Sequence, residues 1–158
     1  MSGNDRVNIL LVDDQPGKLL SYEAILNGLD ANLLKASSGR EALEHLLKVD
    51  VAVILVDVCM PDLDGFQLAA MIRDHPRFQK TAIIFISAIL LSEMDSLRGY
   101  EMGAVDYVSV PVVPEVLRAK VRVFSDLYRK TRQLEDLNRD LEERVAARTA
   151  ELERSTAQ

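Results

Sequence analysis

Short apolar runs alternate with amphipathic stretches over the first two thirds of the chain. The apolar runs are nearly continuous and rich in β-branched and aliphatic residues, which is typical of parallel strands buried on both faces. They occupy residues 8–13, 31–36, 51–57, 82–87 and 105–110. Amphipathic segments between such strands predict helices on both faces of the sheet. The pattern therefore predicts an α/β fold with a doubly wound, five-stranded parallel sheet.

Glycine, proline and serine mark the boundaries between these elements. Pro16 is placed to open the first helix and Gly28 to close it, and Ser38 introduces the second helix. Pro61 and Gly65 interrupt the regular structure after the third strand, and Gly103 ends a fourth helix. Right-handed crossovers between the strands give the predicted order 2-1-3-4-5, with ligands expected beyond the carboxyl ends of the strands.

The last third of the chain follows a helical pattern. No glycine or proline follows Pro114, and strong helix formers dominate, so one helix is predicted from about residue 115 to about residue 153. At ~1.5 Å per residue this helix would be roughly 60 Å long, more than a compact domain can cover. We therefore expect a domain over residues 1–122 and a helix over residues 115–158 that continues from it into a coiled coil.

Heptad spacing in this helix predicts a homodimer. Position a is taken by Phe124, Thr131, Asn138, Val145 and Leu152, and position d by Leu127, Leu134, Leu141 and Arg148. Leucine at successive d positions favours a parallel two-stranded coil, and Asn138 at an a position specifies register and dimer state. Lys130 at g is expected to meet Glu135 at e of the partner helix.

Composition narrows the class of protein. A chain of 158 residues that is 48% hydrophobic and 28% charged is typical of one well-packed soluble domain with an appendage. Its longest apolar stretch, residues 82–91, is too short to span a bilayer, so no membrane insertion is expected. Cys59 is the single cysteine and no secretion signal opens the chain, which together predict a cytoplasmic protein.

The formal net charge of -6 argues against a nucleic-acid partner. Basic residues do precede the leucine heptads, superficially like the basic region of a zipper protein: Arg118, Lys120, Arg122, Arg129, Lys130 and Arg132. Val121, Phe124 and Leu127 interrupt them with residues of the buried type. A solvated helix face is therefore the preferred interpretation of these charges.

Three aspartates stand at strand ends. Asp13 and Asp14 follow the first strand and Asp57 ends the third, and these strands are neighbours in the predicted order. Their carboxylates would converge on one small volume, the kind of oxygen-rich site that Mg²⁺ prefers. Ser87, at the end of the fourth strand, lies on the other side of Asp57 and could donate a hydrogen bond to a phosphoryl oxygen. These residues predict a phosphoryl-transfer site.

Four strings on these strand ends carry a family resemblance: LLVDD, LVDVCMPDLDG, FISA and RGYEMGAVDYVSVP. Over about residues 8–122 the chain resembles the receiver domain of response regulators and hybrid histidine kinases, the phosphoacceptor domain of two-component systems, with its flavodoxin-like fold. The resemblance implies that Asp57 accepts a phosphoryl group from a histidine kinase. It also implies that Asp14, Asp57 and the backbone carbonyl of Cys59 bind Mg²⁺, while Asp13 acts largely through water.

The same resemblance implies a relay function. Ser87 and Tyr107 match the hydroxyl and aromatic pair that reports phosphorylation to the face formed by the fourth helix, fifth strand and fifth helix. A histidine kinase or phosphotransfer protein is the implied partner, and the long helix is similar to connectors that lead to a downstream effector. The chain itself carries no ATP-binding or cyclase signature, so we do not expect a self-sufficient enzyme.

The chain departs from the family pattern at one position. The family carries a lysine just before the proline that follows the fifth strand, and this chain has Val110 there, before Pro111. A valine cannot pair with a phosphoryl group, so the alternative function is a degenerate pseudo-receiver that acts as a constitutive dimerisation scaffold. Cys59 and Ile89 are apolar at positions that control water access in the family, which predicts slow self-dephosphorylation.

Overall fold

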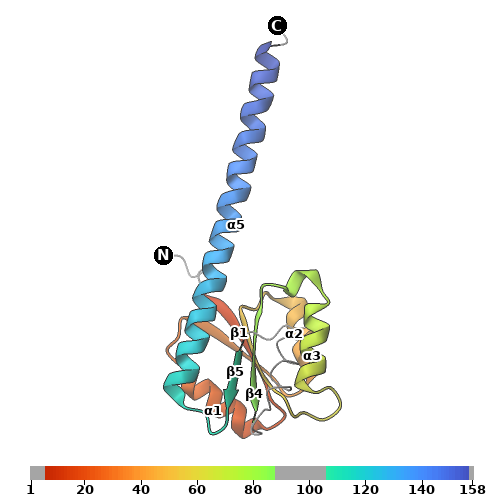
Figure 1. The fold of residues 1–158 in the computed structure, drawn as a ribbon, viewed down its shortest axis with the longest axis vertical. Coiled ribbons are helices and arrows are strands. Elements are labelled where there is room, and N and C mark those ends of the chain that lie inside the picture. The colour runs from red at the N-terminus through yellow and green to blue at the C-terminus, as the bar shows by residue number, and fades with distance from the viewer. Residues whose placement is uncertain (1–5, 88–105, 157–158) are drawn as a thin grey trace.

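Five parallel strands form one sheet in the order β2-β1-β3-β4-β5, which confirms the predicted topology (Figure 1). The computed structural model describes residues 6–87 and 106–156. The strands are β1 (Val7–Val12), β2 (Ala31–Ala36), β3 (Val53–Asp57), β4 (Ala82–Ser87) and β5 (Asp106–Ser109). The helices are α1 (Pro16–Leu26), α2 (Gly39–Lys48), α3 (Gly65–Arg73), the 3₁₀ turn η2 (Pro76–Phe78) and α5 (Pro114–Thr156). The predicted fourth helix and Ile89 lie outside the described residues.

The helices begin and end where the sequence punctuation predicts. Pro16 stands at the start of α1, and Gly28 follows its end with a φ of 94°, a conformation that a residue with a side chain rarely adopts. The Ser38 side chain caps α2 by accepting a hydrogen bond from the Glu41 backbone N–H. A capping box between Asp64 and Gln67 opens α3.

Two hydrophobic layers flank the sheet. One packs α2 and α3 against one face, centred on Leu46, Leu68 and Phe85. The other packs α1 and α5 against the opposite face, where Leu26, Leu117 and Val121 are buried. Central β3 is buried on both faces, as its continuous run of valine, isoleucine and leucine predicts.

Helix α5 starts at the carboxyl edge of the sheet, runs back across it and extends far beyond the opposite edge (Figure 1). Near the point of departure, Arg129 donates to the backbone carbonyl of Asp30, just before β2, and Glu135 forms an ion pair with Lys80, just before β4. From Asp136 to the end of the described side chains, every residue is exposed, including the apolar Leu137 at 55%. The long helix is thus confirmed, whereas Glu135, expected to pair with Lys130 of a second copy, already has a partner within its own chain.

Candidate functional site

Asp13, Asp14 and Asp57 meet at the carboxyl edge of the sheet. They come together because β1 and β3 are hydrogen-bonded neighbours in register, so the residues that leave the two strands emerge side by side. One carboxylate oxygen from each aspartate lies within 4.8 Å of the others. Asp13 and Asp57 are buried, whereas Asp14 is exposed. The arrangement is a small acidic pocket with one open side.

Backbone amides and one side chain hold the two buried carboxylates in place. Asp13 Oδ1 accepts the Gln15 backbone N–H at 2.9 Å, and Asp13 Oδ2 accepts the Tyr22 hydroxyl at 3.1 Å. Asp57 Oδ1 accepts the Cys59 backbone N–H at 3.2 Å. This bond fixes one oxygen of Asp57 and so orients the whole carboxylate, which is the positioning that a metal ligand or a nucleophile requires.

Burial and mutual repulsion make the pocket costly to charge. Removal from solvent raises the pKa of the Asp57 carboxyl, and the neighbouring negative charges of Asp13 and Asp14 raise it further. Burial is also the main cause of the raised pKa of Asp13. The positive charge of Lys18 acts in the opposite direction on both carboxyls. A cation placed among the three oxygens would relieve this repulsion.

The donor set suits a hard divalent cation. Three carboxylates at this spacing offer oxygen ligands only, and they leave positions for water or phosphate oxygens, which is what Mg²⁺ prefers over an all-protein cage. The exposed residue Cys59 supplies a backbone N–H to the site, and the role of its carbonyl in metal binding stays a prediction.

The two predicted switch residues lie on the neighbouring strands. Ser87 is buried at the end of β4, and its backbone carbonyl accepts the Val110 N–H at 3.0 Å. Tyr107 is partly buried on edge strand β5, where its ring packs against Phe85 with 5.5 Å between centroids. Val110 is therefore held beside Ser87 at the functional edge, with 38% of its surface exposed. The switching roles of Ser87 and Tyr107 stay predictions.

Sequence reasoning missed two residues of this pocket. Tyr22 is buried in α1 and binds Asp13, and burial raises the pKa of its own hydroxyl, so it acts as a neutral donor. Lys18, in the first turn of α1, is the second. Both lie within nine residues of Asp13 on the helix that follows it. Their closeness to Asp13 in the sequence could have indicated that they lie near the pocket. Which side chains of α1 point toward the pocket, however, follows only from the packing of the helix.

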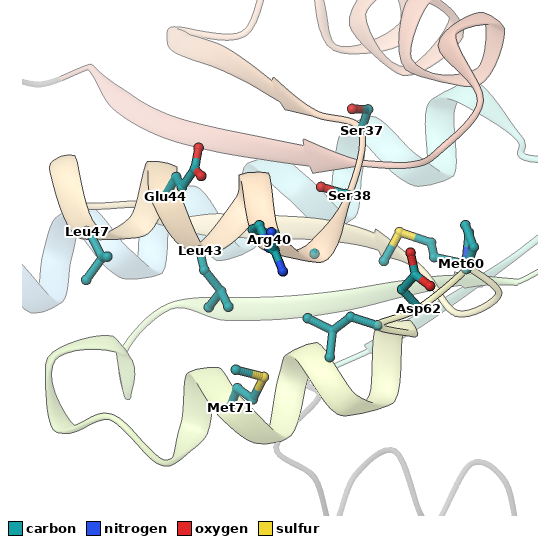
Figure 2. A pocket seen from close by; sticks show the side chains of 12 residues that line it. Ser37, Ser38, Arg40, Leu43, Glu44, Leu47, Met60, Asp62 and Met71 are labelled. Atoms are coloured by element: carbon teal, nitrogen blue, oxygen red, sulfur yellow. The ribbon is translucent and has the colours of Figure 1, made fainter.

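A large cavity in the described part of the chain lies beside this pocket rather than in it. It has a volume of about 780 Å³ and lies between α2 and α3, with Leu43, Leu47 and Met71 facing it (Figure 2). Its end is closed by the loop that follows β3, residues 60–63. This groove is mostly apolar, and the carboxylate cluster of the described residues lies outside it, so the acidic pocket is the better candidate for chemistry.

Comparison with known proteins identifies the family to which this fold belongs. Residues 9–122 match the family model of the response regulator receiver domain. The chain belongs to this family. The match begins within β1, ends at Arg122 in the first turns of α5, and includes all three clustered aspartates.

The curated relatives of this receiver are longer proteins than this chain. A "Probable cyclic di-GMP phosphodiesterase" of Vibrio cholerae is 31% identical over 98% of this chain, which spans 34% of that protein. The response regulator Rre1 of Synechocystis is 33% identical over 73% of this chain, which spans 50% of it. The chain therefore covers about half or less of these curated relatives.

Solved receivers share the fold. The chemotaxis protein CheY4 of Vibrio cholerae superposes with a TM-score of 0.71 at 26% identity, covering 75% of this chain and 98% of that one. The response regulator DrrB of Thermotoga maritima gives a TM-score of 0.68 at 29% identity, covering 77% of this chain and 53% of that one. Among the described helices of the receiver, none combines the length and apolar character needed to cross a membrane.

Proposed function

We propose that the chain is a phosphorelay receiver that accepts a phosphoryl group on Asp57 from a histidine kinase or a phosphotransfer protein, in the cytoplasm. The observation that carries the proposal is the acidic pocket: Asp57 ends the central strand, has one oxygen held by the Cys59 N–H, and shares the pocket with Asp13 and Asp14. Membership of the receiver family supports the same role.

The chemistry is the transfer of a phosphoryl group from a histidine nitrogen to a carboxylate oxygen. A carboxylate oxygen of Asp57 forms a P–O bond while the P–N bond of a phosphohistidine breaks, and the electron pair of that bond stays on the imidazole nitrogen. The product on this chain is an acyl phosphate. Such transfers need positioning and charge neutralisation more than covalent assistance, and the fixed carboxylate supplies the positioning.

Charge neutralisation falls mainly to a metal ion. We assign Asp14, Asp57 and the Cys59 carbonyl as ligands of Mg²⁺, with Asp13 acting largely through water. Bound there, Mg²⁺ would offset the charge that develops on the phosphoryl oxygens. Ser87 and Tyr107 are proposed as the pair that passes the phosphorylated state to the surface.

The signal has to cross the domain. Asp57 lies at the carboxyl edge of the sheet, whereas α5 leaves from the opposite edge beside Asp30 and Lys80. We propose residues 1–122 as the receiver domain and residues 115–158 as a helix that pairs with a second copy and leads to an effector. A relative that matches nearly the whole chain, including this helix, carries a phosphodiesterase name, which supports an effector in the longer protein.

A second function rests on Val110. Because this side chain has no charge at the position of the family's lysine, a pseudo-receiver would keep the fold and the dimer but take no phosphate. The retained aspartates favour the phosphoacceptor, since a scaffold gains nothing from buried carboxylates with raised pKa values.

Intact-mass spectrometry after incubation with Mg²⁺ and acetyl phosphate tests the proposal. We expect one phosphate adduct on the wild type and none on Asp57→Ala. Removal of Mg²⁺ with a chelator should abolish the adduct. A folded wild type that binds Mg²⁺ but takes no phosphate would favour the scaffold.

A further inference from the structure

The acidic pocket needs a positive charge that position 110 does not supply. Phosphorylation would convert the Asp57 carboxylate into an acyl phosphate with two negative charges beside the carboxylates of Asp13 and Asp14, and one Mg²⁺ leaves the sum negative. Val110, held beside Ser87 by a backbone hydrogen bond, has no group that could pair with a phosphoryl oxygen. Another cation at the carboxyl edge would have to do so.

Most lysines of the receiver are unsuitable because they have other partners or lie elsewhere. Lys120 pairs with Asp106 at 2.6 Å, and Lys35 pairs with Glu23 at 2.7 Å. Lys80 pairs with Glu135 at the opposite edge of the sheet. Lys48 ends α2, so it also lies toward that opposite edge. Within the described residues of the receiver, 6–87 and 106–122, this leaves Lys18 as the lysine near the pocket.

Lys18 is connected to the pocket through the backbone. Its N–H donates to the Gln15 carbonyl at 3.1 Å, and the Gln15 N–H in turn donates to Asp13 Oδ1 at 2.9 Å. Lys18 is partly buried, and in the described part of the chain no carboxylate lies within ion-pair distance of it. Its charge nevertheless lowers the pKa of both Asp13 and Asp57. Lys18 therefore acts on the pocket while keeping its donors available.

The position is unfavourable for the helix itself. Lys18 lies in the first turn of α1, a turn that contains no acidic residue and whose N-cap residue, Gln15, makes no side-chain hydrogen bond. A cation near a helix N-terminus opposes the helix dipole at a cost of about 0.3–1 kcal/mol. By contrast, α2 carries Glu41 in its first turn. Stability of α1 thus offers no reason for a lysine at this position.

We propose that the Lys18 ammonium supplies the phosphoryl-binding charge of this receiver, approaching from α1 the group that in the family is approached from the end of the fifth strand. The inference rests on the proposed phosphorylation of Asp57. Lys18 would contact phosphoryl oxygens during transfer from the donor and in the acyl phosphate. It would do so together with Mg²⁺ rather than in its place.

The test measures the initial rate of adduct formation from acetyl phosphate at saturating Mg²⁺. Lys18→Met should lower the rate at least about tenfold, the effect of losing one charge-assisted hydrogen bond. Lys18→Arg should keep a large part of the rate. Lys35→Met is the matched control, because it removes a lysine whose charge is already paired with Glu23, and it should leave the rate unchanged.

A second readout separates this role from a structural one. Mg²⁺ affinity, followed by the rise in melting temperature on Mg²⁺ titration, should stay equal or increase in Lys18→Met, because a repelling cation has been removed from the pocket. Val110→Lys, added to Lys18→Met, should recover the rate by restoring a lysine at the end of β5. Lys18→Gln serves if the methionine variant folds poorly.

The outcomes are distinguishable. A wild type without any adduct overturns the phosphoacceptor function and this inference with it. A wild-type adduct that forms equally fast on Lys18→Met overturns the inference alone. Equal losses in Lys18→Met and Lys35→Met would also overturn it, because the effect would then follow general surface charge.

Discussion

At the scale of single residues, Asp13 and Asp57 carry charge where the surroundings disfavour it. Both pKa values are raised, chiefly because burial removes the carboxylates from water. The native state therefore holds these protons more tightly than the unfolded chain does. Its stability falls as the pH rises through and above the ordinary aspartate value of 3.8, when the carboxylates ionise. The pocket thus lowers stability at neutral pH and leaves a site that a cation can occupy.

Asp57→Asn should therefore stabilise the metal-free protein at neutral pH, since the amide keeps an oxygen for the Cys59 N–H but adds no charge. The gain in melting temperature over wild type should shrink as the pH falls from 8 into the acidic range, because Asp57 then takes up its proton and loses its charge. Mg²⁺ should raise the melting temperature of the wild type but hardly that of the variant. Circular dichroism with EDTA or Mg²⁺ measures both effects. Asp140→Asn, on the exposed end of α5, is the control, and an equal gain there would contradict the explanation.

Tyr22→Phe tests the hydrogen bond that sequence reasoning missed. Loss of the donor to Asp13 should lower the free energy of unfolding by roughly 1–2 kcal/mol, measured by urea denaturation in EDTA. In an Asp13→Asn background the same substitution should cost less, because the bond to a charged acceptor has already been lost. An equal cost in both backgrounds would show that the contribution of the Tyr22 hydroxyl does not depend on the charge of Asp13.

At the scale of elements, the close approach of α3 to β3 positions the loop that carries Cys59. Gly65 begins α3, and its N–H donates to the Val58 carbonyl at 3.0 Å. A Cβ at this position would lie 2.6 Å from the Asp57 carbonyl oxygen and 2.9 Å from Val58 Cα, both backbone atoms. Glycine is required here because neither neighbour can move without displacing β3, the strand that ends in Asp57.

Gly65→Ala should consequently lower the free energy of unfolding by about 1–3 kcal/mol and slow phosphorylation of Asp57. Gly17→Ala, in the first turn of α1, is the matched control, because a Cβ added there would meet no heavy atom within 4 Å. It should leave stability unchanged or increase it by about 0.5 kcal/mol through reduced backbone freedom. Urea denaturation and the acetyl phosphate reaction, run on both variants, measure these effects. Similar losses in the two variants would contradict the steric explanation.

At the scale of the whole molecule, α5 exposes an apolar seam that the described part of its own chain leaves uncovered. Leu134 is 66% exposed, and Leu141, Val145 and Leu152 are similarly exposed along the part that leaves the domain. Their heptad spacing suits a second copy of the helix. The Lys80–Glu135 ion pair and the Arg129 bond to Asp30 connect both sides of the domain to the base of this seam. A change in the receiver could therefore alter the direction in which the helix leaves it.

If the proposed coiled coil forms, the wild type should be a dimer at micromolar concentration and a variant with asparagine at Leu134 and Leu141 a monomer, measured by sedimentation velocity. The polar side chains would remove the apolar contact at two successive d positions. Asparagine at Ala146 and Ala147, which occupy the b and c positions, is the control for any loss of helix propensity and should leave the dimer intact. If the double leucine variant stays dimeric, the main dimer contact would lie in the receiver domain and not in the coiled coil.

Much of this molecule follows from local pattern. Buried parallel strands appear in the sequence as continuous apolar runs, so the strands were predictable. Helix ends need caps, glycine or proline, so element boundaries such as Pro16 and Gly65 were predictable as well. The convergence of Asp13 and Asp57 followed as well, because strand order alone places adjacent strand ends together. The length of α5 required only the absence of breakers after Pro114.

Tertiary structure alone decided which side chains meet across elements. Tyr22 binds Asp13 because α1 packs that face toward the sheet, and sequence periodicity marks a face as buried without naming its contacts. Glu135 pairs with Lys80, 55 residues away, rather than awaiting a partner helix, because α5 is still beside the sheet at that turn. The pKa values of Asp13 and Asp57 likewise depend on burial and on the nearby charge of Lys18. Such contacts join distant parts of the chain, and only the packed fold brings those parts within reach of one another.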